Sequence, residues 1–202
     1  MEVSPDQKTE LDERGYLVVP DAIDEDELAR LSCAFERAVT QGGTEHAPIS
    51  ETTPGADAWQ RFAALPIVHA AARHILGRPF RVSQLHGRNP LPGYGQQGLH
   101  TDWPTRSPGS AYVVVTVIGM FDDFTQDNGA TRVVPGSHLW TRPLPKSLAQ
   151  PLAHHPQECI VTGKAGSVLV FNGHLLHSGT QNRSPQRRRA AQMVLLAQEV
   201  TR

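Results

Sequence analysis

The sequence predicts a mainly β fold with flanking helices, in which an antiparallel double sheet or barrel carries helices on one side. Two observations support this prediction: helical patterns come first, and from Arg81 onward the chain consists of short β-branched or apolar runs separated by Gly, Pro, Asn and Asp. This order of elements is typical of such folds. At 202 residues the chain fits a single domain, with a helical part over residues 1–78 and a β core over residues 79–202.

Three helices are predicted in the N-terminal part. The first follows Asp24, a residue type that caps helices, with Glu27 three residues further on. Its apolar residues then recur at helical spacing: Leu28, Leu31, Phe35 and Val39. The second helix covers residues 56–65. The third begins at Pro66 and ends at Gly77, because proline is favoured at the start of a helix and glycine just after its end.

Between the first two helices, residues 41–57 are rich in Gly, Thr, Pro and Ser and show no apolar period. A loop of this length inside a compact domain is usually either functional or disordered. We therefore expect it to form the main cover of a relatively open pocket.

The β core is predicted to contain six strands. Each is a short run of β-branched or apolar residues, over 81–88, 111–120, 131–134, 159–162, 167–171 and 189–197. No internal repeat or low-complexity segment is present in the sequence.

The composition favours a protein that acts on a small molecule. The formal net charge is −1 and the basic residues largely cluster at 183–189, whereas a nucleic-acid-binding protein needs a basic face. The longest apolar stretches, 111–120 and 167–171, are much shorter than the ~20 residues that span a bilayer. Residues 1–13 are polar and acidic, unlike a secretory signal, and there are only two cysteines, so we expect a cytoplasmic location.

Two motifs can supply metal ligands, and histidine, of which the chain has ten, is the commonest metal ligand. His100 and Asp102 are two residues apart, so in an extended chain both side chains point to one face. His177 follows an apolar strand and a glycine-containing turn, and it offers a third ligand from a different strand. Two histidines and one carboxylate that leave other positions open suit iron(II), which must bind both an oxidisable acid and oxygen.

His174 competes with His177 for the third ligand position. Residues three apart on one extended strand face opposite sides, so both could point inward only if the chain bent at Gly173. We prefer His177, which leaves His174 beside the metal ligands or at the surface. A zinc protease site is disfavoured, because it places two histidines four apart on a helix with a glutamate between them.

The basic run Arg187-Arg188-Arg189 leads into the last predicted strand. As an isolated feature it is typical of a solvated charge cluster. A hairpin from His177 back into the sheet would instead bring one guanidinium group to the rear of the metal pocket, where it could hold a carboxylate through two hydrogen bonds. A diacid that chelates iron with one end and pairs with arginine at the other fits that arrangement.

Three motifs in the second half carry a family resemblance: His100-Thr-Asp102, Leu176-His177-Ser-Gly-Thr-Gln-Asn182 with the arginines after it, and Asp127-Asn-Gly-Ala-Thr-Arg-Val-Val-Pro-Gly-Ser-His138. The third is the most specific of them. With these motifs, and with its opening residues 12–20, the sequence resembles the phytanoyl-CoA dioxygenase family of iron(II)- and 2-oxoglutarate-dependent oxygenases over nearly its whole length.

The resemblance implies a double-stranded β-helix (jelly roll, cupin-like) in which His100, Asp102 and His177 hold iron(II). It implies that Arg188 binds a 2-oxoglutarate carboxylate, with Arg189 as the alternative, and that O2 is consumed. The implied reaction hydroxylates, desaturates or cyclises a small-molecule metabolite and releases succinate and CO2. Relatives that halogenate replace the aspartate by a small residue, so Asp102 disfavours halogenation.

Three further residues are candidates for substrate contact: Trp103, Arg88 and Gln97. The first could form a wall of the pocket, and the other two could bind a polar or acidic substrate. We expect an amino-acid-like or secondary-metabolite substrate rather than a coenzyme A thioester, since no site for phosphates is evident. Two other functions are considered, a catalytically silent β-helix protein that binds a ligand and a zinc hydrolase. The first would normally have lost a ligand, and the second leaves Arg188 unexplained.

Overall fold

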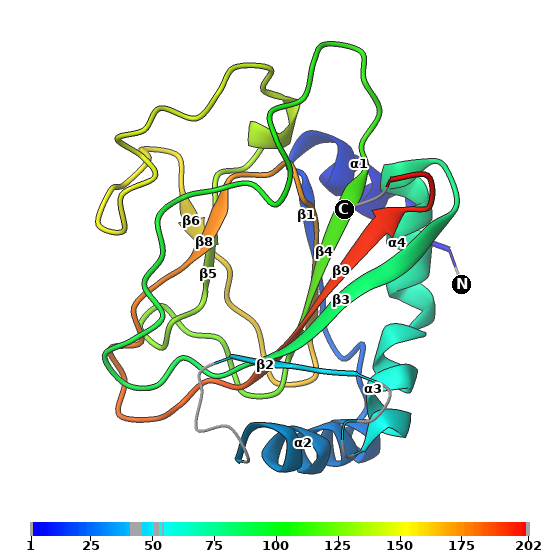
Figure 1. Cartoon of the computed structure of the whole chain (residues 1–202), viewed down its shortest axis with the longest axis vertical. Helices are drawn as coiled ribbons and strands as arrows, with labels where there is room; N and C mark the ends of the chain where they lie inside the picture. Colours follow the sequence, from blue (N-terminus) through cyan, green and yellow to red (C-terminus); the bar gives the residue numbers. More distant parts are fainter. Residues whose placement is uncertain (1, 41–45, 51–52, 54, 201–202) are drawn as a thin grey trace.

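The computed structural model describes the chain except residues 1, 41–45, 51–52, 54 and 201–202, and it shows two antiparallel sheets that face each other (Figure 1). The larger sheet contains, in spatial order, β1 (Tyr16–Val19), β7 (Val168–Asn172), β4 (Val114–Met120), β9 (Ala190–Ala197), β3 (Phe80–Arg88) and β2 (His46–Pro48). The smaller sheet contains β6 (Cys159–Ile160), β5 (Thr131–Val133) and β8 (His177–Gly179). The predicted double sheet is confirmed.

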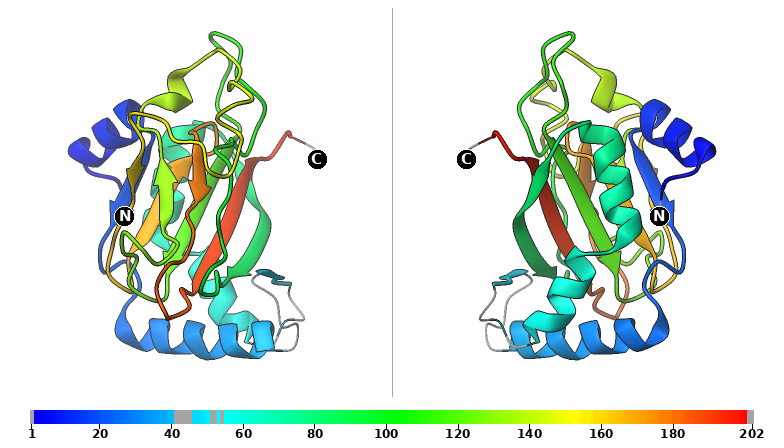
Figure 2. Two further views of the ribbon diagram at one scale, coloured as in Figure 1. Left: turned by 90° about the vertical axis from the view of Figure 1, so that its left-hand side faces the viewer. Right: turned by 90° about the vertical axis from the view of Figure 1, so that its right-hand side faces the viewer.

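Helices α3 and α4 lie on the outer side of the larger sheet, away from the smaller one, while α2 runs across the lower end of the molecule and α1 lies beside β1 (Figures 1 and 2). The helices comprise α1 (Pro5–Glu13), α2 (Glu25–Thr40), α3 (Ala56–Ala63) and α4 (Pro66–Leu76), and a short 3-10 helix, η1 (Ser137–Leu139), follows β5. The three predicted helices are confirmed. Asp24 caps α2 by accepting a hydrogen bond from the Glu27 backbone N–H at 2.8 Å, and Gly77 ends α4 in the left-handed conformation at φ 62°. No helix among the described residues is long and apolar enough to cross a membrane.

Four of the helices and strands were not predicted from the sequence, nor was the short η1. Helix α1 buries only one side chain, Leu11, so it has no apolar period, and it is instead capped by Ser4 and Gln7 in a capping box. Strand β1 extends the larger sheet by pairing with β7, and β8 is too short to be recognised as a run. The expected cover at residues 41–57 lies partly outside the described residues, but β2 forms within it and pairs with β3.

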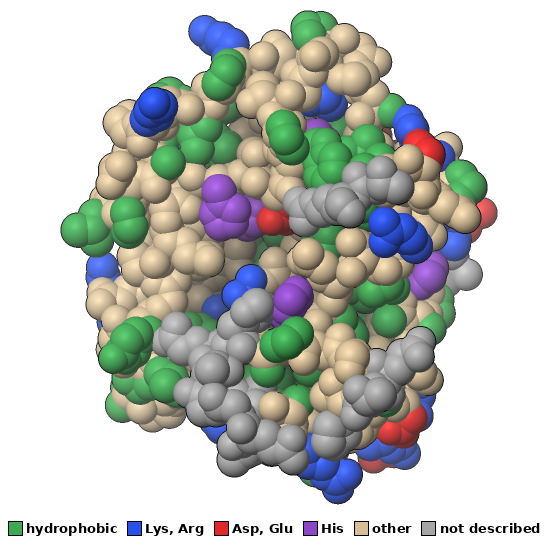
Figure 3. Space-filling view, in the orientation of Figure 1, with side chains coloured by type: hydrophobic (Ala, Val, Ile, Leu, Met, Phe, Trp, Pro, Cys, Tyr) green, Lys and Arg blue, Asp and Glu red, His purple; other side chains and the backbone are tan. Residues whose placement is uncertain are grey.

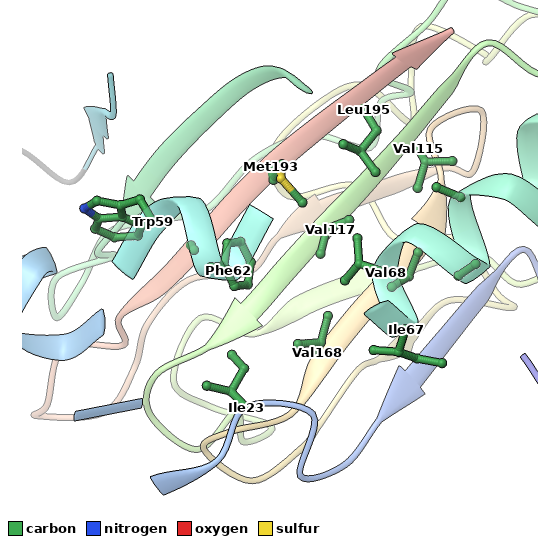
Figure 4. Close-up of a cluster of buried hydrophobic side chains, with 14 of the residues drawn as sticks. Ile23, Trp59, Phe62, Ile67, Val68, Val115, Val117, Val168, Met193 and Leu195 are labelled. Atoms are coloured by element: carbon green, nitrogen blue, oxygen red, sulfur yellow. The ribbon is translucent and has the colours of Figure 1, made fainter. Parts of the chain in front are cut away.

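The outer face of the larger sheet packs on the helices through an apolar core (Figure 4). Strand β4 turns Val115 and Val117 toward this core, and Phe62 of α3 approaches the sheet closely at Gly119, where an added Cβ would lie 2.5 Å from the ring. The core also contains buried side chains from the neighbouring strands and from α4: Val68, Val168, Val170, Met193 and Leu195. Because strands covered on both faces are apolar throughout, they were recognised from the sequence as continuous runs.

The inner face of the larger sheet meets the smaller sheet through a second apolar cluster. It includes Ile118 and Met120 of β4, Phe171 of β7 and Val133 of β5. Polar side chains such as Thr131 and Gln192 accompany the apolar ones between the sheets, and a cavity opens there.

Candidate metal centre

A cavity of about 510 Å³ lies between the two sheets. It is visible as a hollow in the space-filling view, with histidine, acidic and basic side chains around it (Figure 3). Strands β3, β4 and β9 of the larger sheet, β8 of the smaller sheet and the segment 93–102 contribute its lining. The histidine, acidic and basic residues of that lining are His100, His177, Asp102, Arg88 and Arg188.

His100, Asp102 and His177 present one ligand atom each within 4.8 Å of one another. Two backbone hydrogen bonds of 3.0 Å join His100 and His177 directly, so the two imidazoles come from paired antiparallel segments. The Asp102 backbone N–H donates to the Gly173 carbonyl at 2.8 Å, which continues the pairing. Among the residues that the structure describes, this is the one group of three or more side chains arranged to hold a metal ion.

Hydrogen bonds orient each of the three side chains. Nδ1 of His100 lies 2.9 Å from the Gly98 carbonyl and Nδ1 of His177 lies 2.9 Å from the Leu175 carbonyl, which leaves each Nε2 available for a metal. The Thr116 hydroxyl donates to Oδ2 of Asp102. Burial lowers the pKa of His177, which favours the neutral imidazole that binds metal ions. This donor set therefore fits a divalent iron ion with open coordination positions.

His174 lies outside this group. It is buried, not at the surface, and its ring packs against Tyr112 with a centroid separation of 5.7 Å. Trp103 and His174 both line a separate cavity of about 40 Å³, and the structure does not place Trp103 in the lining of the larger cavity. Trp103 packs instead with Val114 of β4 and Val194 of β9.

The three consecutive arginines, which directly precede β9, have different surroundings. Arg188 is buried in the cavity lining, where its guanidinium carbon lies 4.1 Å from the Phe124 ring centroid and Nη2 donates to the Gly129 carbonyl at 2.6 Å. Arg187 pairs with Glu36, and Arg189 pairs with Asp122 (2.6 Å) and Glu36 (3.1 Å). Of the three, only Arg188 is available to a ligand in the cavity. Burial lowers its pKa, and the charge of Arg88 adds to this effect.

The other two predicted substrate residues, Arg88 and Gln97, do line the cavity. Gln97 is held at its rim, since its side-chain oxygen accepts from the Gly179 backbone N–H at 3.0 Å. The Arg88 Nε donates to the side-chain oxygen of Gln192 at 2.5 Å. Thr116 and Gln192 were not singled out from the sequence, although each is the polar residue within an otherwise apolar buried strand. That interruption is the signal that could have identified them.

Arg132, on β5, links the segments that carry the two histidines. Its Nε donates to the Ser178 hydroxyl at 2.6 Å, next to His177, and Nη2 donates to the Gln97 carbonyl at 3.0 Å, three residues before His100. Its Nη1 lies 3.2 Å from Glu158. The guanidinium group is almost fully buried, so these partners replace its hydration.

The sequence matches the family described as phytanoyl-CoA dioxygenase (PhyH) over residues 11–190. The chain belongs to this family. Dioxygenase trt7 of Aspergillus terreus is 30% identical over 145 residues, or 67% of this chain and 49% of the relative. Dioxygenase af480 of Aspergillus fumigatus is 27% identical over 195 residues, or 88% of this chain and 61% of the relative. The chain therefore spans about half to three fifths of the length of these two relatives.

Solved structures share the fold of this PhyH-family chain. HygX from Streptomyces hygroscopicus with nickel and 2-oxoglutarate bound has a TM-score of 0.80 at 19% identity, over 100% of this chain and 90% of that chain. EctD from S. alaskensis with 2-oxoglutarate and 5-hydroxyectoine has a TM-score of 0.77 at 25% identity, over 96% and 76%. The family and the double-stranded β-helix fold predicted from the sequence are confirmed. Iron and 2-oxoglutarate, which the resemblance implied, are bound in solved structures of HygX and EctD.

Proposed function

We propose that this protein is an iron(II)- and 2-oxoglutarate-dependent oxygenase that hydroxylates, desaturates or cyclises a small-molecule metabolite. One observation carries the proposal: three ligand atoms within 4.8 Å of one another share a cavity with a buried arginine. In this proposal His100, Asp102 and His177 hold iron(II), and Arg188 holds the distal carboxylate of 2-oxoglutarate. Iron(II) and 2-oxoglutarate, bound together with O2, would supply the oxidant for an unactivated C–H bond, with release of succinate and CO2.

The protein residues contribute position and exclusion of water. Nε of Arg188 is buried without a hydrogen-bond partner among the described residues, which suits an arginine that receives a carboxylate. Phe124 stacks on its guanidinium group and Phe171 packs on His177 with a centroid separation of 4.5 Å, so apolar rings limit water around both groups. Rigid placement of this kind aligns the reacting atoms before the reaction begins.

The test is an anaerobic titration with iron(II), with and without 2-oxoglutarate, that follows the visible charge-transfer band of the chelate. We expect the band in the wild type, its loss in His177→Ala, and a 2-oxoglutarate affinity at least about tenfold weaker in Arg188→Gln. Matched controls are His74→Ala, a histidine on α4 that pairs with Asp12 away from the cavity, and Arg187→Gln in the same basic run. Both controls should behave as wild type.

Two outcomes would contradict the proposal. A wild-type protein that shows no band, or retains it in His177→Ala, does not use this site for iron. A protein that forms the chelate but never converts 2-oxoglutarate to succinate, with any candidate metabolite, favours a silent ligand-binding protein.

A further inference from the structure

The cavity contains a second arginine that the proposed reaction does not use. Arg88 lies at the end of β3, opposite Ala190 of β9, and it is half-buried in the cavity lining. Among the described residues, no carboxylate forms an ion pair with its guanidinium group within 4.0 Å. Arg187 and Arg189, which flank Arg188 in the sequence, differ in this respect because both are paired with acids.

Gln192 determines how Arg88 can bind a ligand. The side-chain oxygen of Gln192 accepts from Nε of Arg88 at 2.5 Å, which occupies one donor and fixes the plane of the guanidinium group. The amide N–H donors of Gln192 and the terminal nitrogens of Arg88 belong to residues that line the same cavity. This pair therefore offers a set of donors, with a single positive charge, to a group that accepts hydrogen bonds.

The charges in the cavity indicate the sign of that group. In the proposed complex, the charges of iron(II), Asp102, dianionic 2-oxoglutarate and Arg188 cancel. Asp102 is the carboxylate whose charge acts on Arg88, but in the proposed complex Asp102 is bound to iron(II). The positive charge of Arg88 then remains without a counter-charge among the described lining residues. A partly buried cation without a counter-ion is costly in free energy, and a bound anion would remove that cost.

We propose that the substrate carries a carboxylate, and that Arg88 and Gln192 bind it. This inference rests on the proposed function, because it assigns 2-oxoglutarate to Arg188 and the substrate to Arg88. A bidentate contact between a carboxylate and the terminal nitrogens of Arg88 would position the rest of the substrate over the metal centre. The assignment narrows the substrate to small carboxylic acids and excludes cationic or uncharged metabolites.

The test compares small carboxylic acids with their own primary amides, which match them in size but lack the charge. Binding of each pair is measured by calorimetry, on the metal-free protein and on the anaerobic complex with iron(II) and 2-oxoglutarate. We expect at least one acid to bind about tenfold or more tightly than its amide in wild type, and the difference to disappear in Arg88→Gln. Arg88→Lys keeps the positive charge and should retain part of the difference in affinity between the acid and its amide. Arg81→Gln, which removes an exposed arginine from the same strand, should leave the difference in affinity unchanged.

The affinity for 2-oxoglutarate, from the charge-transfer band, separates the two assignments. We expect Arg88→Gln to change it by less than about threefold, while Arg188→Gln weakens it strongly. If Arg88→Gln weakens it as much as Arg188→Gln does, Arg88 serves the co-substrate and the inference is wrong. A panel in which no acid binds wild type better than its amide also overturns it. Absence of the charge-transfer band in wild type would instead count against the proposed function, because the metal-free measurement does not depend on iron.

Discussion

The two faces of the larger sheet are stabilised in different ways. On the outer face, apolar side chains of β4, β7 and β9 pack on α3 and α4, and Val117 and Phe62 are fully buried there. On the inner face near the metal centre, the buried groups include Thr116 and Arg188. Arg132 is buried on the other side of the smaller sheet, because Thr131 and Val133 on either side of it face inward. Each of these polar groups has a specific hydrogen-bond partner.

This difference predicts how the two faces respond to mutation. Apolar packing depends on volume and shape, so a substitution on the outer face should change stability but not the geometry of the metal ligands. Buried hydrogen bonds depend on a partner in a fixed direction, so a substitution among the buried polar groups around the metal centre should change stability and metal affinity together.

Arg132→Met should have the largest effect. It leaves Glu158 without its buried partner and the Gln97 carbonyl and Ser178 hydroxyl without their donor. We expect a loss of about 3 to 5 kcal/mol in the free energy of unfolding, and iron(II) affinity in the folded protein weaker by about 10- to 100-fold. Denaturant unfolding and anaerobic iron titration measure the two quantities. Unchanged iron affinity in a folded Arg132→Met protein would show that Arg132 stabilises the sheet without positioning the ligands.

Phe62→Ala is the corresponding change on the outer face. It removes a fully buried ring that lies over Gly119, so we expect a loss of about 3 kcal/mol or more in the free energy of unfolding from the cavity it leaves. Iron(II) affinity, titrated well below the unfolding temperature, should stay within about twofold of wild type. A large loss of affinity would contradict the proposed independence of the two faces.

Thr116 and Val117 allow the sharpest comparison, because they are neighbours on β4 that face opposite sides. Thr116→Val removes the hydrogen bond to Asp102 at almost constant volume, and we expect iron(II) affinity to fall about tenfold with a stability change of only about 1 kcal/mol. Val117→Thr buries a hydroxyl among apolar side chains, which should cost about 1 to 3 kcal/mol without changing iron affinity. If Thr116→Val leaves iron(II) affinity unchanged while Val117→Thr lowers it, Thr116 has no role in orienting the Asp102 carboxylate.

The same distinction explains what the sequence could predict. Periodicity identified the three predicted helices and the long strands, because burial on both sides of β4 and β9 leaves continuous apolar runs. It could not identify α1, which is held by its cap, or β1 and β8, which depend on partners far away in the sequence. Spacing alone did not rank His177 over His174 decisively, whereas in the structure pairing with His100 directs His177 inward.

The polar contacts of the site were least accessible to sequence reasoning. The motif containing Arg132 was noted for its resemblance to the family, but nothing local predicts that its guanidinium group reaches Gln97 and Ser178. Trp103 was expected at the substrate pocket because it follows Asp102, yet the chain turns it toward Val114 and Val194. Such outcomes depend on how loops pack, which neither periodicity nor composition records.

The smallest predicted effect concerns pH and the acidic partner of Arg132. Burial raises the pKa of Glu158, but hydrogen bonds from His154 and the His155 backbone N–H, with the charge of Arg132, outweigh it and lower the pKa below the ordinary 4.5. A carboxylate with a lowered pKa stabilises the folded state above pH 4.5, and this stabilisation is lost as the pH falls through the folded value. Glu158→Gln should therefore flatten the acid limb of the stability profile, measured by urea unfolding at several pH values, whereas Glu13→Gln, an exposed control, should not. An unchanged acid limb in Glu158→Gln would mean that carbonyl groups, rather than Glu158, compensate the buried charge of Arg132. The hydrogen bonds from Arg132 to Gln97 and Ser178 would then not depend on the ion pair with Glu158.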